Sequence, residues 1–122
     1  MNIGNVIGLL IKKKGLTQKE VADKIGKSPT SLSQIVSGVY QPSSETLKKI
    51  CDVLEVPPAI LYFLTISEDD IPDSKREVYQ MLAPSLKDFI FRVFGSTDGE
   101  VSKLLNQWKN PPGALLQSVP IL

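Results

Sequence analysis

Several residue types that catalysis or metal binding usually requires are missing from this 122-residue chain. Histidine is absent and Cys51 is the only cysteine, so neither an internal disulfide nor a Cys/His metal site can form. The sequence also lacks a Walker-type glycine loop and any cluster of metal ligands. We therefore predict that the protein is not an enzyme and holds no metal or cofactor.

Long hydrophobic runs are missing as well. The longest, such as residues 56–64, fall well short of the roughly 18 residues that a membrane span needs. Residues 1–10 lack the basic segment that precedes the apolar stretch of a secretory signal. A lone cysteine suits a reducing compartment. We expect a cytoplasmic protein that makes no membrane contact.

Arginine is missing from the first 65 residues, yet the charge is unevenly distributed along the chain. Residues 1–65 carry eight lysines against five acidic residues, a balance of +3. Residues 66–122 carry six basic against eight acidic residues, a balance of −2. A basic first half and an acidic second half fit a DNA-contacting domain followed by a segment with another role.

The first helix is predicted from apolar residues that recur at helical spacing over residues 3–11. The pattern stops at residues 12–15, three lysines and a glycine, which suit the C-terminal end of a helix. Gly4 and Gly8 lie one turn apart on this helix and indicate close packing against a neighbour.

Two further helices follow in quick succession. Thr17 and Glu20 form a capping box at the start of the second helix, and Gly26 ends it. Ser28 and Pro29 are favoured at the start of the third helix, which closes at residue 38. Two short helices joined by so tight a turn favour a helix-turn-helix.

The outward face of this third helix is polar but uncharged. Hydroxyl and amide groups can address phosphates or base edges without the desolvation cost of a charge. A helix that merely faces solvent more often carries Lys, Glu or Arg, although Ser and Thr are also common near helix starts. The face comprises Pro29, Thr30, Ser31, Ser33, Gln34 and Ser37.

Two more short helices complete the first half of the chain. Ser43 or Ser44 caps a fourth helix, on whose apolar face Cys51 reads as a small core residue rather than a nucleophile. Pro57 and Pro58 open a fifth helix. The sequence thus predicts an all-α fold with five short helices around one core.

These residues resemble the Cro/C1-type (XRE-like) helix-turn-helix family of transcriptional regulators. The resemblance covers roughly half the chain and keeps the spacing between its elements, which makes it specific. It rests on Leu16–Ala22, Ile25–Gly26, Leu32–Ile35, Gly38, Pro42–Ile50 and Leu54–Pro57. It implies a five-helix, lambda-repressor-like DNA-binding domain over residues 1–66, whose third helix (residues 28–37) enters the major groove of double-stranded DNA as part of a homodimer.

Carried over position by position, the resemblance also implies which residues touch DNA. The residues expected to contact bases are Pro29, Thr30, Ser33 and Gln34. Those expected to contact the phosphate backbone are Gln18, Lys19, Lys27, Ser28, Ser31, Ser37, Tyr40, Gln41 and Ser43. Gln18 is the expected phosphate clamp at the start of the second helix, where the helix dipole adds to the attraction.

The third helix departs from strong base readers in two ways. Pro29 offers no side-chain hydrogen bond, and no arginine is available for a bidentate guanine contact. Gln34 is the best candidate for direct readout, by a bidentate contact with adenine. Tyr40 either stacks against a sugar-phosphate or packs over the edge of the domain. We predict modest intrinsic specificity, with dimerisation and DNA shape supplying the rest.

The second half of the chain is predicted as an acidic linker over residues 67–74 and a helical extension over residues 75–122. Pro84 is expected to break or kink the first helix of the extension, and a last helix is expected from Asp98 to residue 108. An apolar stripe in the extension requires a partner surface. The stripe consists of Leu86, Phe89, Ile90, Val93 and Phe94.

Three surfaces could cover this stripe. They are the DNA-binding domain of the same chain, a second copy of the chain in a homodimer, which we favour, and a separate protein. The functional alternatives follow from them. The protein is a transcriptional regulator, most often a repressor in this family, or an antitoxin-like or adaptor protein whose extension binds a protein partner.

Overall fold

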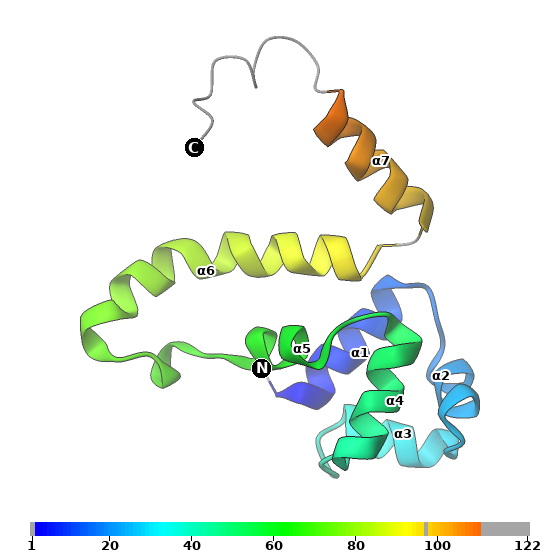
Figure 1. Cartoon of the computed structure of the whole chain (residues 1–122). Helices are drawn as coiled ribbons and strands as arrows, with labels where there is room; N and C mark the ends of the chain where they lie inside the picture. The colour runs from blue at the N-terminus through cyan, green and yellow to red at the C-terminus, as the bar shows by residue number, and fades with distance from the viewer. Residues whose placement is uncertain (1, 97, 111–122) are drawn as a thin grey trace.

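The computed structural model describes residues 2–96 and 98–110, and over these residues the chain is all-helical (Figure 1). This confirms the predicted fold class. The helices are α1 (Ile3–Lys13), α2 (Gln18–Ile25), α3 (Pro29–Val36), α4 (Ser44–Leu54), α5 (Pro58–Thr65), the 3₁₀ turn η1 (Glu68–Asp70), α6 (Asp73–Phe94) and α7 (Asp98–Lys109). None of these described helices is long and apolar enough to cross a membrane. The part of the predicted helical extension beyond residue 110 lies outside the described residues.

Side-chain caps fix the starts of the short helices. Thr17 accepts a hydrogen bond from the Glu20 amide at 3.1 Å, and Glu20 accepts one from the Thr17 amide at 3.3 Å. This is the predicted capping box, in which two free amides at the helix start are satisfied reciprocally. Ser43, rather than Ser44, caps α4. Gly26 ends α2 with φ 72°, a conformation that glycine adopts without strain.

The core lies among α1 to α5 and takes apolar side chains from each of them. The fully buried large side chains are Ile7, Leu10, Leu32, Ile50, Leu54, Leu61 and Leu64. Cys51 is only 1% exposed, which confirms its assignment to the core. Burial, and secondarily the neighbouring Asp52 carboxylate, raise the pKa of the Cys51 thiol. The thiol therefore stays protonated and unreactive.

Helix α1 approaches α3 at the two glycines that were predicted to pack closely. A Cβ added to Gly4 would lie 2.1 Å from the carbonyl oxygen of Ile35, and one added to Gly8 would lie 2.8 Å from a methyl carbon of Val36. No side chain fits at the Gly4 position without moving the backbone of α3. The pair of glycines thus sets the distance between α1 and the C-terminal end of α3.

The segment predicted as an acidic linker is a folded turn held by side chains of α6. Arg76 donates hydrogen bonds to the carbonyl oxygens of Glu68 and Ile71, both at 3.1 Å. The Tyr79 hydroxyl donates to the Ile66 carbonyl at 2.8 Å, and the Lys87 ammonium donates to the same oxygen. These bonds join sites up to 21 residues apart, which explains why local composition suggested a linker instead.

Helix α6 runs through Pro84 without a break. Proline removes the hydrogen bond that its amide would donate to residue 80, and helices commonly bend there. The ribbon of α6 changes direction along its length (Figure 1). Pro84 is exposed, so water can satisfy the freed carbonyl, while Ala83 beside it is buried and holds the helix in place. Of the two predicted outcomes at Pro84, a break and a kink, the structure thus excludes the break.

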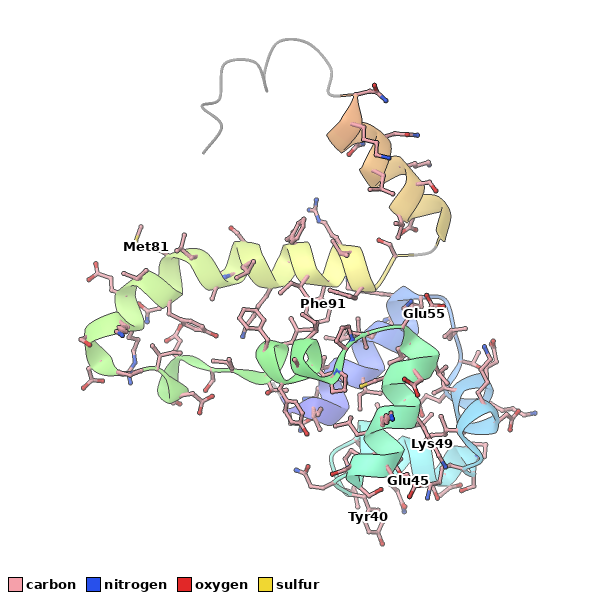
Figure 2. The ribbon with its side chains drawn as sticks, viewed as in Figure 1. Tyr40, Glu45, Lys49, Glu55, Met81 and Phe91 are labelled. Atoms are coloured by element: carbon pink, nitrogen blue, oxygen red, sulfur yellow. The ribbon has the colours of Figure 1, made fainter. Side chains whose placement is uncertain are left out.

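The apolar stripe predicted for α6 divides between two sides of the helix. Ile90, Phe91 and Phe94 pack against the core of the domain, and the Lys13 ammonium lies 5.8 Å from the centre of the Phe91 ring. Figure 2 shows Phe91 between α6 and the domain. Leu86 and Phe89 are exposed, and Val93 is half-buried. Part of the stripe thus folds back on the same chain, one of the three surfaces considered.

The Gly4 contact predicts a stability difference between two glycine-to-alanine changes. Gly4→Ala should lower the free energy of unfolding by about 2–3 kcal/mol or more, because the new methyl group collides with the Ile35 carbonyl. Gly99→Ala, in α7 with nothing within 4 Å, is the matched control and should be neutral or stabilising by about 0.5–1 kcal/mol. Urea unfolding measures both. An unchanged midpoint for Gly4→Ala would contradict the close approach.

Candidate nucleic-acid interface

The third helix has one buried and one exposed side. Leu32 and Ile35 point into the core and fix the rotation of α3 about its own axis. Residues 30, 33, 34 and 37 then fall on the opposite side by helical spacing. Thr30 and Ser33 are exposed and Gln34 is half-buried. The structure therefore brings together three of the four predicted base-contacting side chains, and the fourth, Pro29, is exposed at the first position of α3.

The turn between α2 and α3 consists of residues 26–28. The Lys27 amide donates to the carbonyl of Ala22 at 2.9 Å, which closes the C-terminus of α2. Ser28 then caps α3, accepting a hydrogen bond from the Ser31 amide at 3.1 Å. Because this turn has only three residues, it keeps α3 close to α2. The polar side of α3 stays exposed to solvent.

Three hydroxyls predicted to contact phosphates are already engaged within the chain. Ser28 donates to the Ser31 hydroxyl at 3.0 Å, and Ser37 donates to the carbonyl of Gln34 at 3.2 Å. Ser43 donates to the Thr46 hydroxyl at 3.0 Å while capping α4. A hydroxyl carries one proton, so each would have to break a bond to donate to DNA. Their role shown here is to cap and close helices.

Other polar side chains at the surface have donor groups that are not used in hydrogen bonds within the fold. Within the described part of the chain, no side-chain hydrogen bond involves Thr30, Ser33, Gln34, Gln18 or Gln41. An uncharged donor that is not used within the fold can bond DNA without first losing a partner. The uncommitted groups gather on α3 and on the segments that flank it.

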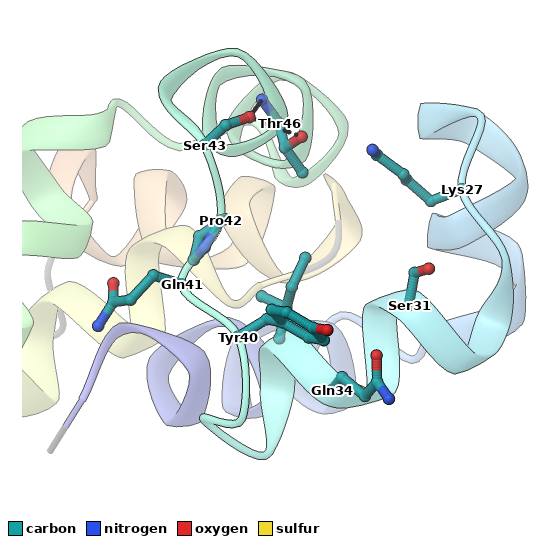
Figure 3. A pocket seen from close by; sticks show the side chains of 9 residues that line it. Lys27, Ser31, Gln34, Tyr40, Gln41, Pro42, Ser43 and Thr46 are labelled. Carbon is teal, nitrogen blue, oxygen red and sulfur yellow. Dashed lines mark hydrogen bonds between the residues drawn. The ribbon is translucent and has the colours of Figure 1, made fainter.

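A hollow of about 380 Å³ lies beside α3 (Figure 3). Lys27 and Ser31 line one side and Tyr40 with Gln41 lines the other, with Gln34 pointing to the same region. Tyr40 is 61% exposed, and its backbone amide bonds the carbonyl of Gln34 at 3.2 Å. The ring therefore stands at the surface, where it borders the hollow. The hollow brings together one base candidate, Gln34, and five phosphate candidates: Lys27, Ser31, Tyr40, Gln41 and Ser43.

The start of α2 offers a second polar group. Gln18 is the first residue of α2 and lines a shallow depression between α1 and α2, and Lys19 beside it is exposed. The first-turn amides of a helix carry a partial positive charge that attracts a phosphate. Gln18, α3 and the hollow together give the protein an uncharged centre with lysines at its margin.

Sequence reasoning missed one member of this surface. Thr46 is buried and lines the hollow. It has no local signal that points to DNA, because it contributes through its position in the first turn of α4.

Comparisons with known proteins agree with this arrangement. A family model described as "Helix-turn-helix" matches residues 7–61. The ImmF control region 10 kDa protein of Bacillus phage phi105 is 39% identical over 62 residues, which cover 48% of this chain and 69% of the phage protein. No solved structure matches the chain significantly.

Two curated relatives reach beyond the helix-turn-helix. The cyanate hydratase of Pseudomonas putida (strain F1) is 29% identical over 102 residues, covering 75% of this chain and 68% of its own. The cyanate hydratase of Aquifex aeolicus (strain VF5) is 28% identical over 117 residues, covering 84% of this chain and 77% of its own. A continuous span of 84% must contain the whole of α6 wherever it begins.

The family model covers the α2–turn–α3 unit and its supporting helices, and the phage protein is similar over a comparable length. The chain belongs to the Cro/C1-type helix-turn-helix family of DNA-binding regulators.

Proposed function

We propose that this protein is a sequence-specific transcriptional repressor that sets α3 in the major groove of its operator as a homodimer. The observation that carries the proposal is the row of uncommitted, uncharged donors on the outward side of α3. Leu32 and Ile35 fix this side in place, and the tight turn from α2 leaves it open. Such a surface has no role in the fold and matches the polar edges of bases.

Gln34 is the main residue that reads the bases. Its amide can pair with both N6 and N7 of an adenine, a contact that excludes the other bases by about 1–3 kcal/mol. Thr30 and Ser33 add single hydrogen bonds or contact a thymine methyl group. Because residues 1–65 contain no arginine, we expect no strong guanine contact from the domain and an operator rich in A·T pairs near α3.

Groups around α3 supply most of the affinity for DNA. Lys27 at the hollow, Lys19 at the start of α2 and the Tyr40 ring lie where the backbone on either side of the groove would pass. Each phosphate that a lysine neutralises releases condensed counterions, so binding should weaken with salt. Repression then needs only occupancy, since a domain seated in the groove blocks the same stretch of DNA to other proteins. The phage relative is named as a control region protein, which supports a role in control.

Selection from a random duplex pool with the purified protein tests this proposal. The expected result is an enriched A·T-containing half-site, and a pair of half-sites about 10 bp apart would indicate that two α3 helices read one face of the duplex. Absence of any enriched sequence would overturn sequence-specific recognition.

Gln34→Ala should lower discrimination at one base pair by about 1–3 kcal/mol while leaving the fold intact, because the Gln34 side chain has no hydrogen-bond partner in the described structure. Competition binding between the selected site and its single-base variants measures the change. If the variant discriminates as well as the wild type at every position, the assignment of α3 is wrong.

Gln18→Ala is the matched comparison. It should weaken binding to all sequences alike, because Gln18 stands at the start of α2 and away from the base-reading side of α3. A Lys27→Ala variant should in addition reduce the slope of log affinity against log salt by about one. A loss confined to one base pair in either variant would contradict their roles as phosphate contacts.

A second candidate function is favoured by the exposed apolar side of α6. Val78, Met81 and Leu82 are exposed there together with Leu86 and Phe89. A protein partner seated on this side would make the chain antitoxin-like or an adaptor, with DNA binding secondary. Co-purification of a stoichiometric partner that an exposed α6 substitution abolishes would favour this candidate.

We propose further that the likeness to cyanate hydratases reflects shared helices and not shared activity. The hollow at the α6 turn is lined in part by Glu68, whose carboxylate would repel an anion such as cyanate. The Lys87 ammonium and the Tyr79 hydroxyl beside it already donate to the Ile66 carbonyl. The Tyr79 hydroxyl has only one proton and so cannot also donate to an anion there, and the Lys87 ammonium also lies 5.7 Å from the centre of the Tyr79 ring.

The purified protein should therefore release ammonia from cyanate no faster than buffer does, with the Pseudomonas putida hydratase as positive control. Release that depends on protein concentration and is lost in Lys87→Ala would contradict this expectation and place a reaction site at the α6 turn.

A further inference from the structure

Helix α6 leaves one apolar side without cover. Val78, Met81, Leu82, Leu86 and Phe89, here called the outer face of α6, are all exposed, with Met81 at 72% and Phe89 at 62%. The opposite side of the helix, with Ala83 and Phe94, packs against the rest of the chain. Figure 2 shows Met81 on the side of α6 that points away from the domain.

We propose that the outer face of α6 pairs with the outer face of a second copy of this chain, in antiparallel orientation. The inference rests on the proposed function only for its consequence at DNA. Helical spacing places residues 78, 81, 82, 85, 86 and 89 on one side, and each is apolar except Ser85. No charged side chain interrupts this side over three turns.

The arrangement of the outer face suits an isologous contact. The midpoint between Val78 and Phe89 coincides with the midpoint of α6, which spans residues 73–94. An antiparallel two-fold therefore sets Val78 of one chain opposite Phe89 of the other, Met81 opposite Leu86 and Leu82 opposite Ser85. Four of the five apolar residues of the outer face meet an apolar residue, and Leu82 packs against the small Ser85 side chain in a self-complementary contact.

The exposed apolar area is large enough to drive association. Five side chains exposed by half to three quarters add up to an apolar patch on the order of 500 Å² per chain. A standard interface buries about 800 Å² per partner, of which the outer part is polar. The outer face of α6 supplies the apolar centre, in which Ser85 is the polar position, and exposed polar residues around it such as Ser74 supply the rim.

This pairing would place the two DNA-binding surfaces on opposite sides of the dimer. Tyr40, beside α3, and Met81 lie on opposite sides of the molecule (Figure 2). Two copies joined at α6 therefore turn their α3 helices away from each other. The dimer we propose at α6 thus bridges two duplex segments, and it is a different pair from the two copies that the proposed function sets on one operator.

Sedimentation equilibrium of the full-length protein, without DNA, tests the pairing. Wild type should be dimeric at tens of micromolar, and Leu82→Glu should be monomeric with unchanged helical content, because Leu82 is exposed in the monomer. Leu82→Met, which keeps the apolar contact, and Ser102→Glu, which adds the same charge at an exposed position of α7, should both stay dimeric. A monomeric wild type, or a dimeric Leu82→Glu, overturns the pairing.

A bead-bound duplex carrying the selected half-site then tests the geometry. Wild type should retain a second, free duplex on the beads, and Leu82→Glu should bind the first duplex without retaining the second. Binding of both half-sites of one duplex by the α6 dimer, with no second duplex retained, overturns the bridging. Dimers that bind no DNA at all overturn both the bridging and the proposed function while leaving the α6 pairing supported.

Discussion

The direct backbone contact between α1 and α3 is the constraint on which the DNA-binding surface depends. At Gly4, α1 comes so close to the Ile35 carbonyl that no side chain fits between them. This contact fixes the C-terminal end of α3, and the Ser28 cap fixes the N-terminal end. Gln34 belongs to the last turn of a helix only eight residues long, so the position of its amide is set by these two anchors. Base readout by an uncharged side chain tolerates little positional error, because a hydrogen bond weakens steeply with angle.

The part of the fold that local signals determine was predictable from the sequence. The Thr17–Glu20 capping box and the Gly26 exit act within four residues, and each appears where the pattern placed it. The apolar face of α3 also fixed which of its residues point outward. The predicted DNA contacts themselves stay predictions, although the structure groups Lys27, Gln34 and Tyr40 around one hollow. What composition did not reveal is that the Ser28 and Ser43 hydroxyls are used up in capping.

The second half of the chain was harder to predict because its structure depends on contacts distant in the sequence. An acidic, proline-containing stretch has the composition of a linker, yet Arg76 and Tyr79 hold its carbonyls against α6. An apolar stripe cannot say which of its members will face their own domain. Phe94 does so and Phe89 does not, and one turn of helix separates them. Pro84 illustrates the same limit, since a proline on the solvent side of a long, anchored helix costs a hydrogen bond without ending the helix.

The hydrogen bonds from α6 to the Ile66 carbonyl also determine whether the DNA-binding domain can be separated from the rest of the chain. Residues 1–66 contain every helix of the DNA-binding domain, but Ile90, Phe91 and Phe94 cover part of its core from outside. A chain ended at residue 66 would bare that apolar surface and leave the Ile66 carbonyl without its two donors. The domain and α6 are therefore expected to unfold together as one cooperative unit. A recombination event that exchanged the extension of this protein for another would have to supply a new cover for the same surface.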